Sequence, residues 1–71
     1  MKNPIQVLDV VALLHDNADN QLVAGQVGTV VEILDEGVYE VEFSDDSGKT
    51  YAMATLEDED LILLHYSPTA A

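Results

Sequence analysis

The sequence predicts an all-β protein, a small, five-stranded and partly open barrel. Hydrophobic residues alternate with a period of two, most clearly in VYEVEF (residues 38–43), and no segment has the period of 3.6 that is typical of a helix. Five short strand-like segments follow one another about 8 to 12 residues apart, a spacing typical of sandwiches and barrels. In a chain of 71 residues a barrel is the economical arrangement, because closing the sheet hides its edges.

Length and composition predict a single domain over residues 1–71, with an ordered core from about residue 6 to 66 and frayed tails at both ends. A hydrophobic content of 48% is ordinary for a folded protein. The chain has no cysteine, so neither disulfides nor thiolate metal sites are expected to stabilise it. It also lacks the long apolar run of a signal peptide or membrane span, and we therefore expect a cytoplasmic protein.

The best-determined element is a β-hairpin formed by residues 27–34 and 38–43. We predict that Asp35, Glu36 and Gly37 form a three-residue loop in which Gly37 adopts a left-handed backbone. Counting outward from this loop gives the pairs Leu34 with Val38, Ile33 with Tyr39, Glu32 with Glu40, Val31 with Val41, and Thr29 with Phe43. This register places the following side chains inward: Val27, Thr29, Val31, Ile33, Tyr39, Val41 and Phe43.

The other segments complete the barrel. In chain order we expect a strand at 8–14, a polar loop at 15–21, a turn at 45–48, a strand at 49–56, a single 3₁₀ turn at 57–60 and a last strand at 61–65. The four glycines are interpreted as structural positions in turns or bulges rather than as a ligand site; they are Gly25, Gly28, Gly37 and Gly48.

Charge restricts the possible partners. The chain has 14 Asp and Glu residues, two lysines (Lys2 and Lys49) and no arginine, which gives a net charge of -12. A protein that binds a nucleic-acid duplex neutralises several phosphates with Lys or Arg, and anionic membranes also attract basic segments. This composition therefore argues against both partners. It leaves a basic protein partner, a cation, or no charged partner.

The chain resembles a known family of small bacterial proteins. The order of the segments and the motifs GQVGTVVEI and YEVEF resemble an SH3-like barrel of the branch that includes KOW modules. DVVALL, GQVGTVVEILDEGVYEVEF, SDDSGKTYA and LILLH are more closely similar to the family named domain of unknown function 4926, over nearly all of residues 8–65. The resemblance implies a fold and companion proteins, in some cases in arrangements suggestive of toxin and antitoxin pairs. The glycines of KOW modules are present, whereas their basic residues are missing.

No catalytic, cofactor-binding or metal-binding set is predicted. His15 and His65, at the ends of the first and last strands, could bind a divalent metal with Asp16 or Asp60 if the two strand ends met, but their spacing matches no standard motif. DNADNQ lacks the central glycine and the final glutamate of a calcium loop. The three serines, Ser44, Ser47 and Ser67, have no histidine placed to activate them.

The hairpin has one outward face that could bind a partner. It consists of Val30, Glu32, Leu34, Val38, Glu40 and Glu42. Glu32 lies opposite Glu40, where like charges destabilise a sheet, and a Lys or Arg from a partner between the two carboxylates would remove that repulsion. We therefore expect a non-catalytic protein-interaction module, most concretely one that neutralises a basic protein as an antitoxin or immunity protein does. The alternatives are a KOW-like module associated with RNA and a self-assembling structural protein.

Overall fold

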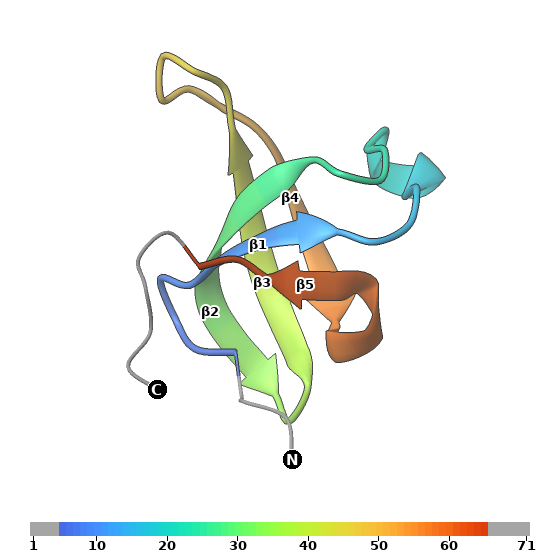
Figure 1. Ribbon diagram of the computed structural model, residues 1–71, viewed down its shortest axis with the longest axis vertical. Coiled ribbons are helices and arrows are strands. Elements are labelled where there is room, and N and C mark those ends of the chain that lie inside the picture. Colours follow the sequence, from blue (N-terminus) through green and yellow to red (C-terminus); the bar gives the residue numbers. More distant parts are fainter. Residues whose placement is uncertain (1–4, 66–71) are drawn as a thin grey trace.

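The computed structural model describes residues 5–65 and confirms the all-β class (Figure 1). The expected frayed tails lie outside the described residues. In the described range the elements are β1 (Val10–Leu13), the 3₁₀ turn η1 (Ala18–Asn20), β2 (Val27–Asp35), β3 (Val38–Ser44), β4 (Thr50–Glu57), the 3₁₀ turn η2 (Asp58–Asp60) and β5 (Leu61–Leu63). The strands and the 3₁₀ turn predicted near residues 57–60 are thus present, with boundaries shifted by a few residues.

The strands form one antiparallel sheet in the order β4-β3-β2-β1-β5. β4 and β5 do not pair with each other, so the barrel is partly open, as the sequence predicts. Figure 1 shows the β1–β5 pair crossing in front of β3 and β4, with the curved strand β2 belonging to both parts. The molecule therefore has two outer sheet faces that point in different directions.

The core lies between the two parts of the sheet. Its largest fully buried side chain is that of Phe43. Leu22 also reaches the core from the long loop between β1 and β2, where its backbone pairs with that of Asn17 through hydrogen bonds of 2.8 and 2.9 Å. Within residues 5–65 the core cluster consists of the buried residues Ile5, Val11, Leu13, Leu22, Val30, Tyr39, Val41, Phe43, Ala54, Leu56 and Leu61.

The predicted hairpin register is correct in its middle and wrong on either side. Ile33 pairs with Tyr39 and Glu32 with Glu40, as expected. The other pairs are Asp35 with Val38, Val30 with Val41, and Thr29 with Glu42, so the pairs predicted for Leu34, Val31 and Thr29 are wrong. The register shifts between Val30 and Glu32 and again between Ile33 and Asp35, and the loop shortens to Glu36 and Gly37. β-Bulges of this kind increase the local bend and twist, which β2 needs in order to pair with β3 and β1 in different parts of the sheet.

The bulge also reverses the inward set of β2 on the Val30 side of the shift. Val30 is fully buried and Gly28 is buried, whereas Val27 and Val31, predicted to point inward, are exposed. Ile33 keeps its predicted partner Tyr39 but is also exposed. Gly28 explains why the side of β2 that carries Gly28 and Val30 faces the core. A Cβ atom there would lie 2.7 Å from Cγ1 of Val41 and 2.9 Å from the carbonyl oxygen of Glu42, so β2 and β3 approach closely only because this position has no side chain. The inward positions of Tyr39, Val41 and Phe43 on β3 are confirmed.

Candidate interaction surfaces

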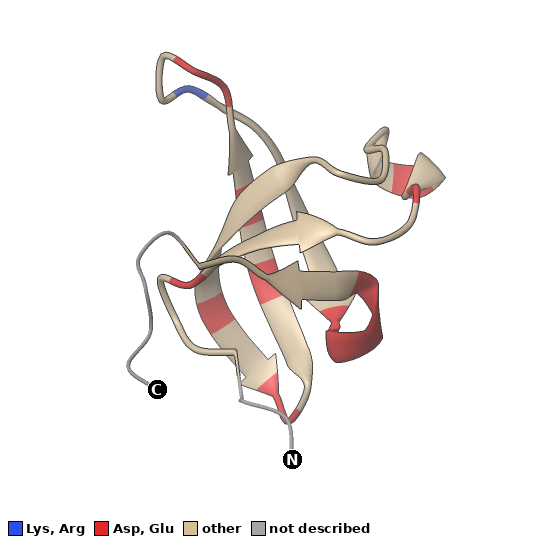
Figure 2. Ribbon diagram, viewed as in Figure 1, with Lys and Arg blue, Asp and Glu red and all other residues tan. Residues whose placement is uncertain are grey.

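The acidic face of the hairpin is formed by Glu32, Glu40 and Glu42 on the outer side of β2 and β3. Glu32 and Glu40 are direct cross-strand partners. β4 orients two of the carboxylates: the Thr55 hydroxyl donates to Glu40 at 2.8 Å, and the Thr50 hydroxyl donates to Glu42 at 2.7 Å. Figure 2 shows acidic positions on β2 and β3, and Lys49 in the β3–β4 loop, where it directly precedes Thr50, the hydrogen-bond partner of Glu42. Within residues 5–65 none of the three glutamates forms an ion pair.

The structure changes the apolar part of the predicted partner face. Val30 belongs to the core with no exposed surface, so it cannot contact a partner. A regular register counted from the loop places Val30 outward, and the bulge after Val30 turns its side chain into the core. Leu34 is exposed but lies at the second bulge, where Asp35 replaces it opposite Val38. Val38 is half-buried. The face therefore keeps its carboxylates and loses the aliphatic surround that the sequence suggests.

Beside this face, η2 is attached to the hairpin by a buried tyrosine. The Tyr39 hydroxyl donates to Oδ1 of Asp58 at 2.6 Å, and the backbone N–H of Asp58 donates to the Gly37 carbonyl at 3.0 Å. Burial, helped by the hydrogen bond and the negative charge of Asp58, raises the pKa of Tyr39 to about 12. Gly37 has φ +74°, as predicted for the loop glycine, and a Cβ there would lie 3.1 Å from Oδ2 of Asp58. The two hydrogen bonds of Asp58, to Tyr39 and to Gly37, hold η2 across the open side of the barrel.

The two histidines lie at opposite ends of the β1–β5 pair. Val11 pairs with Leu63 and Leu13 with Leu61, so His15 follows the end of β1 near the start of β5, whereas His65 follows the end of β5 near the start of β1. At about 3.3 Å per strand residue the two are roughly 20 Å apart along the sheet. They do not form one site. Residues 5–65 contain no group of three or more His, Asp or Glu residues that could hold a metal ion.

Sequence reasoning missed a second candidate surface, the outer side of β1 and β5. A continuous apolar run such as VVAL at 10–13 is also typical of a strand buried on both sides, so the run alone gives no reason to expect an exposed face. The signal that could have revealed it is the lack of charge at alternate positions of both segments. Val10, Ala12 and Leu14 in the first segment, and Ile62 and Leu64 in the last, are all uncharged.

Fold and surfaces together define a small acidic domain built on one five-stranded antiparallel β-sheet. The chain belongs to the family described as Domain of unknown function (DUF4926), whose model matches residues 7–63. No curated protein and no solved structure matches the chain. Among the described residues, no helix has the length and apolar character needed to span a membrane.

Proposed function

We propose that this domain is a non-catalytic, cytoplasmic protein-interaction module that binds a basic protein and neutralises it as an antitoxin or immunity protein does. The observation that carries the proposal is the pair Glu32 and Glu40, which face each other across β2 and β3 without an ion pair to any residue of 5–65. Like charges directly opposite on a sheet destabilise it by several tenths of a kcal/mol, roughly 0.2 to 1. A Lys or Arg of a partner, inserted between the carboxylates, turns this cost into a favourable contact.

The surroundings of the pair support a basic partner. Glu42 lies two positions further along β3 on the same side, and Thr55 and Thr50 fix the directions of the Glu40 and Glu42 carboxylates. Oriented carboxylates lose less conformational freedom on binding than mobile ones. A net charge of -12 also accelerates the encounter with a basic protein.

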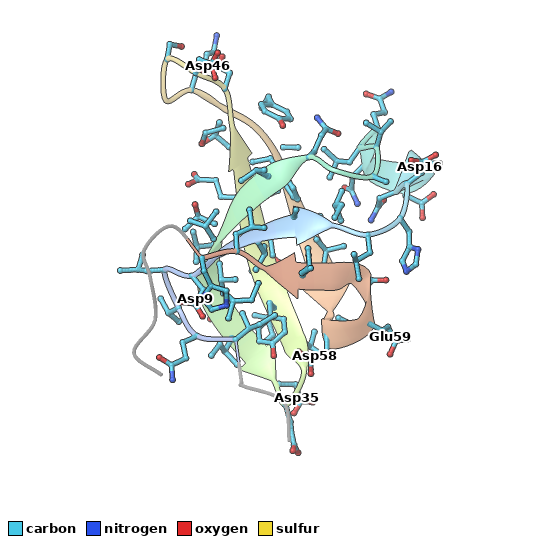
Figure 3. All side chains as sticks on the ribbon, in the orientation of Figure 1. Asp9, Asp16, Asp35, Asp46, Asp58 and Glu59 are labelled. Atoms are coloured by element: carbon cyan, nitrogen blue, oxygen red, sulfur yellow. The ribbon has the colours of Figure 1, made fainter. Side chains whose placement is uncertain are left out.

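The test uses charge reversal with a matched control. Immobilised wild-type chain, Glu32→Lys, Glu40→Lys and Asp46→Lys are used in parallel to capture proteins from a lysate of cells that encode the chain. Asp46 is exposed in the β3–β4 loop, away from the acidic face (Figure 3), and its substitution changes the net charge by the same amount. We expect one basic protein to be retained by the wild type and by Asp46→Lys, and at least tenfold less of it by the other two variants.

Two results contradict this proposal. Equal retention of the basic protein by all four chains would show that the acidic face is not the contact. Recovery of RNA in place of a basic protein, with a salt-sensitive shift of the purified chain, would instead support the KOW-like alternative.

A further inference from the structure

The outer side of β1, β5 and the start of β2 forms a continuous apolar face. Its side chains are Val10, Ala12 and Leu14 on and after β1, Ile62 and Leu64 on and after β5, and Val27 on β2. In the middle of this face, Ala12 pairs with Ile62 on one side and with Val27 on the other, so the three side chains form one row across three strands. We call these six residues the apolar face.

Exposure shows that the apolar face is not part of the core. Leu14 and Val27 are each 47% exposed and Ile62 is 49% exposed. Ala12 is only 9% exposed, yet it does not belong to the core cluster. Its larger cross-strand neighbours Ile62 and Val27 flank it on either side, and both of them are about half exposed. Soluble monomers rarely expose large contiguous apolar patches, and such patches mark interaction sites.

Acidic residues surround the apolar face and do not enter it. Figure 2 shows no acidic residue on β1 or β5, although the chain has 14 of them. In Figure 3, Asp9 lies at one end of the β1–β5 pair, and Asp16 and Glu59 lie near the other. Along the sheet, Val10 pairs with Thr29 and Thr29 with Glu42, so the apolar face borders the acidic face described above. Its border thus bears negative charge on three sides.

We propose that the apolar face is the central contact surface for a protein partner whose own patch has an apolar centre surrounded by Lys and Arg. This inference rests on the proposed function and adds the place where the partner docks. An apolar centre with a polar rim is the usual anatomy of a protein interface, and complementary rim charges set specificity and association rate. A second copy of this chain is a poor fit, because it would bring the same acidic border, and a charge of -12, against its own.

The experiment first identifies the partner by contact. A photo-crosslinking amino acid replaces Ile62 in one chain and Asp46 in another, and both chains are expressed in cells of the organism that encodes the protein. We expect Ile62 to crosslink to a basic protein through a segment in which apolar residues are flanked by Lys or Arg, and Asp46 to give no such product. A product of twice the chain mass at Ile62 identifies a second copy and overturns the inference.

Affinity of the purified pair then tests the residues themselves. Val27→Thr combined with Ile62→Thr is compared with Val23→Thr, the same chemical change at an exposed valine in the β1–β2 loop. We expect the double variant to weaken binding at least tenfold, and Val23→Thr to change it less than twofold, with all chains showing the wild-type circular dichroism spectrum. Unchanged affinity of the double variant overturns the inference.

The two proposals fail in different ways. If the captured basic protein is lost with Glu32→Lys and Glu40→Lys but is unaffected by Val27→Thr with Ile62→Thr, the proposed function stands and the apolar face is not its docking surface. If the affinity depends on Val27 and Ile62 but not on Glu32 and Glu40, docking on the apolar face stands and the acidic pair is not the contact. If neither capture nor crosslinking yields a protein partner, both proposals are wrong.

Discussion

Reversing the charge of Glu32 should make the domain more stable while it weakens partner binding. Glu32 and Glu40 are cross-strand partners, and the hydrogen bond from Thr55 draws the Glu40 carboxylate toward β4. We therefore take a carboxylate separation of about 7 Å, somewhat beyond the cross-strand Cβ distance. In water the repulsion is then about 0.6 kcal/mol, and screening in 10 mM salt reduces it to about 0.5 kcal/mol. Glu32→Lys replaces this repulsion by an attraction of similar size, a total gain of about 1 kcal/mol.

The assay is urea unfolding followed by circular dichroism, in 10 mM and in 1 M salt. A gain of 1 kcal/mol in the free energy of unfolding moves the urea midpoint to a higher concentration, and in a thermal scan of a domain of this size it raises Tm by about 4 to 8 °C. In 1 M salt the screening length falls to about 3 Å, and the difference between Glu32→Lys and the wild type should nearly disappear. Asp46→Lys controls for the general effect of a less negative chain, so the local contribution is the excess of Glu32→Lys over Asp46→Lys. Equal stability of these two variants in 10 mM salt would refute the reasoning.

Four further predictions concern the fold. Tyr39→Phe should destabilise the domain by about 1 to 2 kcal/mol in urea unfolding at pH 7, because it removes a hydrogen bond to a carboxylate. The pKa of Tyr39 rises from 10 to about 12 on folding, so wild-type stability should be fully present below pH 10 and fall as the pH approaches 12. The full pKa shift corresponds to about 2.7 kcal/mol, but solvent near the hydroxyl should reduce the loss of stability to about 1 to 2 kcal/mol. If the stability of Tyr39→Phe falls equally between pH 10 and pH 12, the loss does not come from Tyr39. Gly28→Ala should lower the free energy of unfolding by about 1 to 2 kcal/mol. In a Val41→Ala background this loss should be smaller, because Cγ1 of Val41, one of the clashing atoms, is gone. A Gly28→Ala variant as stable as the wild type would show that β2 and β3 can move apart. Leu8 has φ +77° and is 74% exposed. Leu8→Gly should therefore relieve backbone strain and leave the free energy of unfolding, measured by thermal unfolding, unchanged or raise it by up to about 1 kcal/mol. A clear loss of stability would mean that the Leu8 side chain makes stabilising contacts.

Much of the hairpin could be predicted from the sequence because its signals are local. Clean alternation in VYEVEF correctly predicts which side of β3 is buried, and the glycine of DEG correctly predicts the left-handed loop position. These two features predict the middle of the hairpin register, which includes the opposed pair Glu32 and Glu40.

β2 could not be predicted in the same way. In VGTVVEIL both alternating sets contain aliphatic residues, so periodicity does not decide between Val30 and Val31 as the buried residue. The decision is made by tertiary contacts, namely the close approach of β3 to Gly28 and the bulge that follows Val30. The acidic part of the candidate site therefore follows from the sequence, whereas its apolar part requires the sheet order, which places β1 between β2 and β5.

The pairing of β1 with β5 has a consequence for when the apolar face comes into existence. Val11 pairs with Leu63, about 50 residues further along, whereas Ile33 and Tyr39 are near neighbours in the chain. Closing the longer loop costs roughly 2 kcal/mol more in chain entropy than closing the hairpin, so β5 is expected to join the sheet after β2, β3 and β4 have assembled. A chain still emerging from the ribosome can thus form the acidic hairpin before it can form the apolar face. A partner that docks on the apolar face would bind only finished molecules.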